Sequence, residues 1–209
     1  MKFTRVISTV LLLTVAGVAQ AHPGHGTENS LLNGLLHPLL GVDHLLVMLT
    51  VGFWSLLFIR QVRTAAGEQR TERGLPGRHL LVPAVFIGVM LVGAVLGAQS
   101  GMLAGVMEQV VFASVIVMAL LVSGQLALPG ALLMPMIALF ALFHGVAHGS
   151  EATGNLYGYM AGFTLTTAVL LFTGYRLARA CELRGVIGAG GKLLGFSLLA
   201  GAGGLLLFS

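Results

Sequence analysis

Long apolar runs are the feature that most constrains how this chain can fold. Each is close to the ~20 residues that a helix needs to cross the hydrocarbon core of a bilayer. The runs cover residues 31–59, 80–98, 106–127, 131–149, 156–178 and 186–208. The sequence therefore predicts an all-α, polytopic membrane helix bundle with about six transmembrane helices.

The composition agrees with a membrane protein that contains no separate soluble domain. Hydrophobic residues make up 56% of the chain and charged residues 9%, a balance well outside that of soluble globular domains. Thirty glycines indicate helices that pack closely through small residues. Two regular spacings place such glycines on single helix faces, Gly93-x3-Gly97-x3-Gly101-x3-Gly105 and Gly154-x3-Gly158-x3-Gly162. The lone cysteine, Cys181, excludes an internal disulfide framework and a multi-cysteine metal site.

Residues 1–21 are predicted to be a cleavable signal peptide. Lys2 and Arg5 precede an apolar stretch, residues 6–18, which leads into an Ala-x-Ala pattern at Ala19 and Ala21. The apolar stretch is too short to span a membrane comfortably. We expect residues 22–209 to form one transmembrane helical domain, with its N-terminus on the outer side of the membrane.

The basic residues carry information about topology. Most lie in the loop between residues 60 and 78 and in the segment between residues 176 and 192. With the mature N-terminus outside, both segments fall in the cytoplasm, as the positive-inside rule requires. The predicted location is the bacterial inner membrane, with a periplasmic N-terminus. The lipid bilayer is the expected partner. The formal charge of +4 is not read as a nucleic-acid interface, because the basic residues are distributed as a topology signal.

Ionisable residues are rare inside the apolar runs and gather in two of them. A charged side chain in a membrane span costs at least ~2.5–3.5 kcal/mol on insertion scales, so it needs a partner or a purpose. The two groups are His37, Asp43 and His44 in the first run, and His144 and His148 in the fourth, with Glu151 just beyond; outside them, Lys192 lies near the inner end of the sixth run and Glu108 at the outer end of the third. Counted from the cytoplasmic side at 1.5 Å per residue, His44 lies ~24 Å and His148 ~27 Å into the membrane. The two groups are therefore predicted to meet in the outer part of the bilayer.

Helical spacing indicates which of these side chains can act together. His144 and His148 are four residues apart and share a face, which Glu151 extends. On one continuous helix, His37 and His44 also share a face, and Asp43 is turned ~100° away from His44.

Pro38 is expected in a first turn or at a kink, so that the first helix would begin near His37 rather than at Leu31.

Imidazole and carboxylate groups without cysteine suit Ni²⁺, Co²⁺, Zn²⁺ or Cu²⁺. Their concentration at one depth favours a metal or proton site over isolated interhelical hydrogen bonds. Three functions remain open on the residues alone. They are a metal permease, a metal-binding accessory or sensor protein, and an intramembrane hydrolase with zinc held by three histidines and Asp43 or Glu151 as general base. Further candidate ligands are His22, His25 and Glu108.

Two longer motifs resemble a known family. "HPLLGVDH", residues 37–44, has the form His-x5-Asp-His, and "FHGVAHGSE", residues 143–151, has the form Phe-His-Gly-x-Ala-His-Gly-x-Glu. With the signal peptide and about six spans, the chain resembles the HupE/UreJ family of hydrogenase and urease accessory membrane proteins, regarded as nickel permeases.

The resemblance implies a transporter rather than an enzyme. Its transported substrate would be a nickel ion, taken up from the periplasm to the cytoplasm for hydrogenase or urease maturation. Cobalt, zinc and copper remain alternative ions. A homo-oligomer also remains an open alternative. The implied metal-handling residues are His37, Asp43, His44, His144, His148 and Glu151. Because histidine must be neutral to bind a metal, we expect capture to weaken as the external pH falls through ~6.5.

Overall fold

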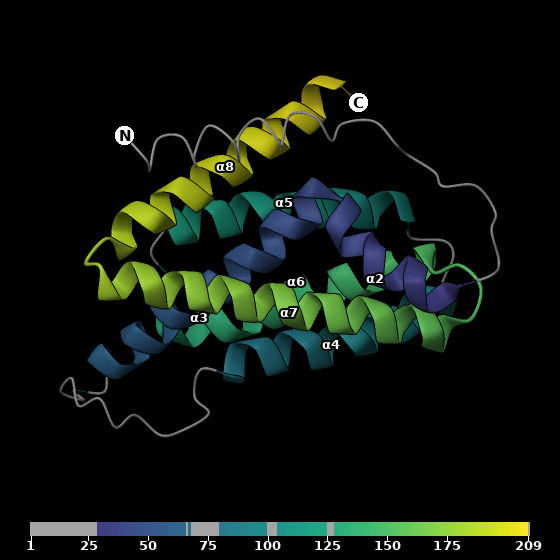
Figure 1. Ribbon diagram of the computed structural model, residues 1–209, viewed down its shortest axis with the longest axis horizontal. Helices are drawn as coiled ribbons and strands as arrows, with labels where there is room; N and C mark the ends of the chain where they lie inside the picture. Colours follow the sequence, from purple (N-terminus) through teal and green to yellow (C-terminus); the bar gives the residue numbers. More distant parts are fainter. Residues whose placement is uncertain (1–28, 66, 68–79, 100–103, 125–127, 209) are drawn as a thin grey trace.

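The structure, a computed structural model, describes residues 29–65, 67, 80–99, 104–124 and 128–208, and all regular structure in these ranges is helical (Figure 1). The helices are α2 (Ser30–Leu40), α3 (Val42–Ala65), α4 (Leu81–Gln99), α5 (Ala104–Ser123), α6 (Gly130–Glu151), α7 (Leu156–Leu183) and α8 (Ile187–Phe208). The predicted all-α membrane bundle is confirmed. The predicted signal peptide lies outside the described residues.

Helix length and composition identify the membrane-crossing segments. Among the described residues, four helical segments are long and apolar enough to span a bilayer: His44–Thr64, Leu81–Gln99, Gly130–Glu151 and Leu156–Leu183. Shorter apolar helical segments cover Ser30–Leu40, Gln109–Ser123 and Ile187–Ala202. Large apolar side chains such as Val92, Leu132, Leu165 and Phe172 are more than half exposed on the bundle surface, as expected of residues that face lipid rather than water.

The first apolar run forms two helices, and the expectation of one continuous helix starting near His37 was wrong. Helix α2 already begins at Ser30, where the Asn29 side chain accepts a hydrogen bond from the Leu32 N–H at 3.2 Å. Pro38 lies within α2, and the break comes three residues later at Gly41, whose backbone is extended with φ −84° and ψ 110°. Glycine is the weakest helix former apart from proline, so a break is least costly there. The two helices meet at an angle (Figure 1).

The helices pack in pairs through glycine contacts. Helix α4 packs on α6, α7 packs on both α2 and α3, and α5 packs on α8. A methyl group added at Gly93 or Gly97 would collide with the backbone of α6, and one added at Gly145 or Gly149 would collide with the backbone of α4. Gly93 and Gly97 of the first predicted glycine spacing therefore mark a real helix contact, whereas Gly101 lies outside the described residues and Gly105 belongs to α5, so the spacing does not lie on a single helix.

The second glycine spacing is only partly helical. Gly154 lies in the α6–α7 connection with φ +70°, and it is Gly162 that touches the backbone of α2.

Opposite charges join α3 and α7 at the end of the bundle far from His37 and His44. The Arg60 Nε atom lies 3.7 Å from Glu182 Oε1, and Arg179 also contacts the Glu182 carboxylate. Between this end and the histidines lies a core of fully buried apolar side chains, among them Met48, Phe53 and Leu171.

Candidate metal site

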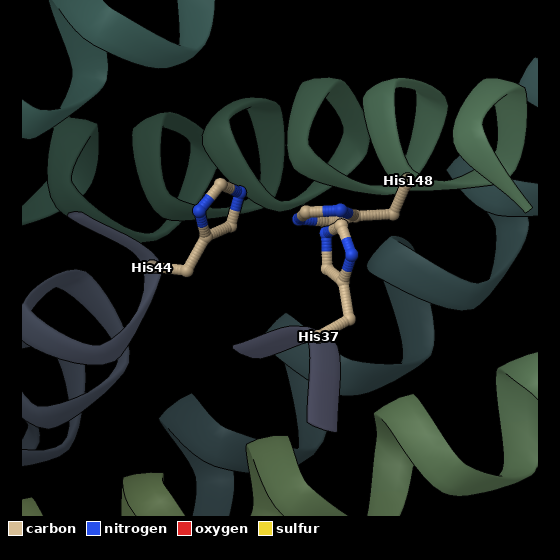
Figure 2. Close-up of side chains that lie close together, drawn as sticks. All are labelled: His37, His44 and His148. Atoms are coloured by element: carbon tan, nitrogen blue, oxygen red, sulfur yellow. The ribbon is translucent and has the colours of Figure 1, made fainter. Parts of the chain in front are cut away.

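Three imidazoles from three helices converge at one end of the bundle. His37 comes from α2, His44 from α3 and His148 from α6, and Figure 2 shows their rings grouped together. The ring centroids of His37 and His148 are 4.8 Å apart, those of His44 and His148 are 4.6 Å apart, and those of His37 and His44 are 5.6 Å apart. The two motifs predicted to meet from the first and fourth apolar runs do meet in the structure.

Helix breaks and close helix contacts place these rings. The break at Gly41 separates His37, in the last turn of α2, from His44, in the first turn of α3. His148 lies in the last turn of α6. Gly145 and Gly149 of the same helix press against the backbone of α4, so rotation of α6 is restricted and the direction of its histidines is fixed.

His148 lies at the centre of the group and is completely buried. Neither of its ring nitrogens has a hydrogen-bond partner among the described residues. A buried polar group left without a partner costs about 1–3 kcal/mol, which a bound cation would offset by accepting a nitrogen lone pair. A buried imidazole whose nitrogens have no hydrogen-bond partner among the described residues has the properties expected of a metal ligand.

The Glu151 carboxylate lies beside two of the three imidazoles. Its Oε2 atom is 3.4 Å from His37 Nε2 and 3.5 Å from His148 Nδ1. The Glu151 side chain is 55% exposed and that of His37 30% exposed, so the group opens toward the surface on this side. With neutral imidazoles, the carboxylate gives the group a net charge of −1, which attracts a divalent cation.

The ligand atoms are close enough to share one ion after a small adjustment. One ligand atom from each of His37, His44 and His148 lies within 4.8 Å of the others. Nitrogens bound at about 2.1 Å in a tetrahedral shell lie about 3.4 Å apart. The ligand atoms would therefore draw together by up to about 1.4 Å when an ion binds, a movement that side-chain rotation can supply.

His144 lies near the group without belonging to the closest three. Its ring is 6.2 Å from that of His44 and 6.2 Å from that of His148. Its Nδ1 atom lies 3.1 Å from the Phe140 carbonyl oxygen. A carbonyl can only accept, so Nδ1 carries the proton and Nε2 holds the lone pair that could bind a metal. His144 therefore offers a nitrogen one helical turn from His148.

The remaining predicted ligands fall outside the described side chains. Asp43 lies in the first turn of α3 and Glu108 in the first turn and a half of α5, but the structure describes neither side chain. His22 and His25 lie outside the described residues altogether.

Aromatic side chains from α4 and α7 complete the surroundings and were not predicted from the sequence. The Phe163 ring is 4.5 Å from that of His148, the Tyr159 ring is 5.8 Å from that of His37, and the Phe86 ring is 6.2 Å from that of His144. The sequence offered one weak signal for Tyr159, its place beside the glycine spacing at the start of the fifth apolar run, which it shares with Tyr157. Nothing in the sequence marked the phenylalanines.

Comparison with known proteins gives one family and one relative. The family model described as "HupE / UreJ protein" matches residues 10–206. The chain is 33% identical over 180 residues to the protein named "Protein HupE" from Rhizobium leguminosarum bv. viciae, a match that covers 85% of each chain. No solved structure matches.

Proposed function

The chain belongs to the HupE/UreJ family, and on that premise we propose that it is an uptake permease for a divalent transition-metal ion. The cargo is Ni²⁺, taken from the periplasm to the cytoplasm to supply hydrogenase or urease maturation. The protein lies in the bacterial inner membrane with its mature N-terminus in the periplasm. No catalytic role is assigned to its side chains.

The observation that carries this proposal is the buried His148 imidazole, without a hydrogen-bond partner among the described residues, between His37 and His44. Hydrogen bonding between helices explains a lone membrane histidine well, but it does not explain an unsatisfied imidazole surrounded by two others. A shared cation satisfies all three rings at once. Three imidazoles with a carboxylate suit Ni²⁺ and its neighbours in the first transition row, and the choice of nickel rests on the family.

Charge distribution supports the orientation. Arg60 and Arg179 lie at the end of the bundle opposite the histidines. Under the positive-inside rule that end is cytoplasmic. The histidines then lie at the periplasmic end, where an incoming ion arrives first.

The membrane potential is sufficient to drive inward movement. It contributes ~2.3 kcal/mol per charge per 100 mV, hence about 4.6 kcal/mol for a 2+ ion at that voltage. We assign capture to His37, His44, His148 and Glu151, with Asp43 as a further ligand. His144, one turn deeper on α6, receives the ion next, before a rearrangement of the helices releases it inward.

The test is accumulation of radioactive nickel by proteoliposomes that hold the purified protein and an inside-negative potential. The wild type should accumulate nickel, and single alanine variants of the assigned residues should lose most of the uptake: His37, Asp43, His44, His144, His148 and Glu151. Ser150→Ala is the matched control, since Ser150 is exposed and its hydroxyl donates to the Ala147 carbonyl oxygen of its own helix. Normal uptake in all six variants would contradict the proposal. Binding without accumulation would indicate a sensor or accessory protein instead.

A further inference from the structure

Tyr159 on α7 is a buried residue that the transport proposal leaves without a role. Its side chain is 2% exposed, and its ring meets that of His37 edge-on, 5.8 Å away at 66°. Tyr159 also stacks on Phe163, with ring planes 9° apart, and Phe163 in turn lies against His148. The aromatic pair therefore forms the wall of the histidine group on the α7 side.

The Tyr159 hydroxyl is buried and has no hydrogen-bond partner among the described residues. Several other hydroxyls in this bundle donate to carbonyl groups of their own helices, although the buried hydroxyls of Thr50, Thr164 and Thr167, like that of Tyr159, have no hydrogen-bond partner among the described residues. Ser55 donates to Gly52, Ser114 to Val111 and Thr173 to Val169, at 2.6, 2.6 and 2.7 Å. A tyrosine side chain is too long to reach back to its own helix in this way, so the buried phenol needs a partner from elsewhere.

Packing alone does not account for a hydroxyl here. Phenylalanine would give the same ring contacts without the penalty of about 1–3 kcal/mol for an unsatisfied buried polar group. Unsatisfied groups that persist in a folded protein are expected where a ligand or an ion later satisfies them. The His148 imidazole, whose ring lies against Phe163, also has no hydrogen-bond partner among the described residues, so one bound ion and its ligands would satisfy both groups.

The backbone holds Tyr159 firmly in this place. A methyl group added at Gly34 would collide with the Tyr159 carbonyl group, and one added at Gly162 would collide with the backbone of α2. Helices α2 and α7 therefore touch backbone to backbone at Tyr159 and one turn after it. His37 follows Gly34 by one turn, so Tyr159 and His37 are fixed relative to each other.

We propose that Tyr159 is a positioning residue of the metal site, an inference that rests on the proposed function. With the ion bound, its hydroxyl donates a hydrogen bond to the oxygen ligand that completes the shell left open by the three imidazoles. That oxygen belongs either to the Glu151 carboxylate or to a water molecule on the ion. Such outer hydrogen bonds orient the inner ligands, and losing one typically weakens metal binding by about 10–100-fold.

The test uses the full chain in detergent, with Ni²⁺ binding measured by calorimetry and thermal unfolding measured without metal. Tyr159→Phe removes only the hydroxyl. Its matched control is Tyr157→Phe on the same helix, where the side chain is 82% exposed. We expect Tyr159→Phe to raise the Kd for Ni²⁺ about tenfold or more, while the metal-free Tm stays the same or rises because an unsatisfied group is gone. The control should change neither quantity.

A spectroscopic measurement separates positioning from packing. With Co²⁺ as the probe, Tyr159→Phe should shift the visible d–d absorption bands, and Tyr157→Phe should leave them in place. Adding Glu151→Gln distinguishes the two oxygen sources. Non-additive changes in Kd identify the carboxylate as the partner, and additive changes identify water.

The outcomes separate this inference from the proposed function. If the wild-type protein binds no nickel, the proposed function itself is contradicted. A wild type that binds nickel, with a Tyr159→Phe variant of equal Kd and equal Co²⁺ spectrum, would overturn the role of Tyr159 alone. A lowered metal-free Tm with an unchanged Kd would also overturn it, since the hydroxyl would then serve only the fold.

Discussion

Gly34 on α2 allows a direct test of whether helix approach controls the metal site. A Cβ atom added at Gly34 would lie 2.8 Å from the Tyr159 carbonyl carbon and 3.0 Å from the Phe163 backbone nitrogen. Non-bonded heavy atoms prefer about 3.5–4.0 Å, so Gly34→Ala must push α2 away from α7 by about 1 Å. Overpacking of this kind costs about 1–3 kcal/mol. For a chain of this size, that lowers the Tm by roughly 2–4 °C per kcal/mol.

The same displacement should reach the histidines. His37 lies one turn beyond Gly34 and moves with α2, whereas a binding site tolerates errors of only about 0.5 Å. We expect Gly34→Ala to weaken Ni²⁺ binding about tenfold or more, as measured by calorimetry on the purified protein.

Two other glycines provide the controls. Gly52→Ala places a Cβ 2.8 Å from the Leu171 carbonyl carbon, a comparable collision between α3 and α7 but about 12 Å along α3 from His44. It should lower the Tm and leave the nickel Kd nearly unchanged. In Gly88→Ala on α4, the added Cβ meets nothing within 4 Å. This variant should lower neither the Tm nor the affinity for nickel. If Gly34→Ala binds nickel as tightly as Gly52→Ala, the link between helix approach and the site is refuted.

Three further predictions follow from the same geometry. His148→Leu should abolish nickel binding in calorimetry, yet leave the metal-free Tm equal or higher because the replaced imidazole nitrogens are buried without hydrogen-bond partners among the described residues; retained binding would contradict the central place of His148. His144→Leu should change the nickel Kd by less than about threefold but slow proteoliposome uptake at least about tenfold, since His144 lies one turn from the closest three ligands; equal losses of binding and uptake would place it in the capture site instead. Nickel affinity should fall as the pH decreases from 7.5 to 5.5, because each imidazole that gains a proton loses its ligating lone pair; a flat pH profile would indicate that the histidines do not bind the ion.

Composition and residue spacing were sufficient to predict the class of fold. A run of about twenty apolar residues can satisfy its backbone hydrogen bonds in lipid by forming a helix, whatever its neighbours do. The two motifs were also recognisable, because ionisable side chains stand out inside apolar runs. Counting residues from the cytoplasmic ends of the two runs placed His44 and His148 at similar depth, and the structure brings their rings 4.6 Å apart.

The arrangement around the site depended on contacts that the sequence does not display. Treating residues 31–59 as one helix put His37 and His44 on a common face, whereas the structure joins them across the break at Gly41. A glycine that ends a helix and one that packs inside it, such as Gly34, look the same in a sequence. Which of the two occurs depends on whether another backbone lies against the glycine.

The sequence by itself therefore determined a helical membrane bundle and the side chains able to bind a metal, because both follow from local chemistry and from distance along the chain. Only the tertiary structure decided that His37, His44 and His148 form the closest group, that His144 lies one turn away, and that Tyr159 borders the group. These relations are set by how α2, α3, α6 and α7 are rotated and spaced. Rotation and spacing depend on which small residues meet across helices, a property of pairs of helices that no single run of residues contains.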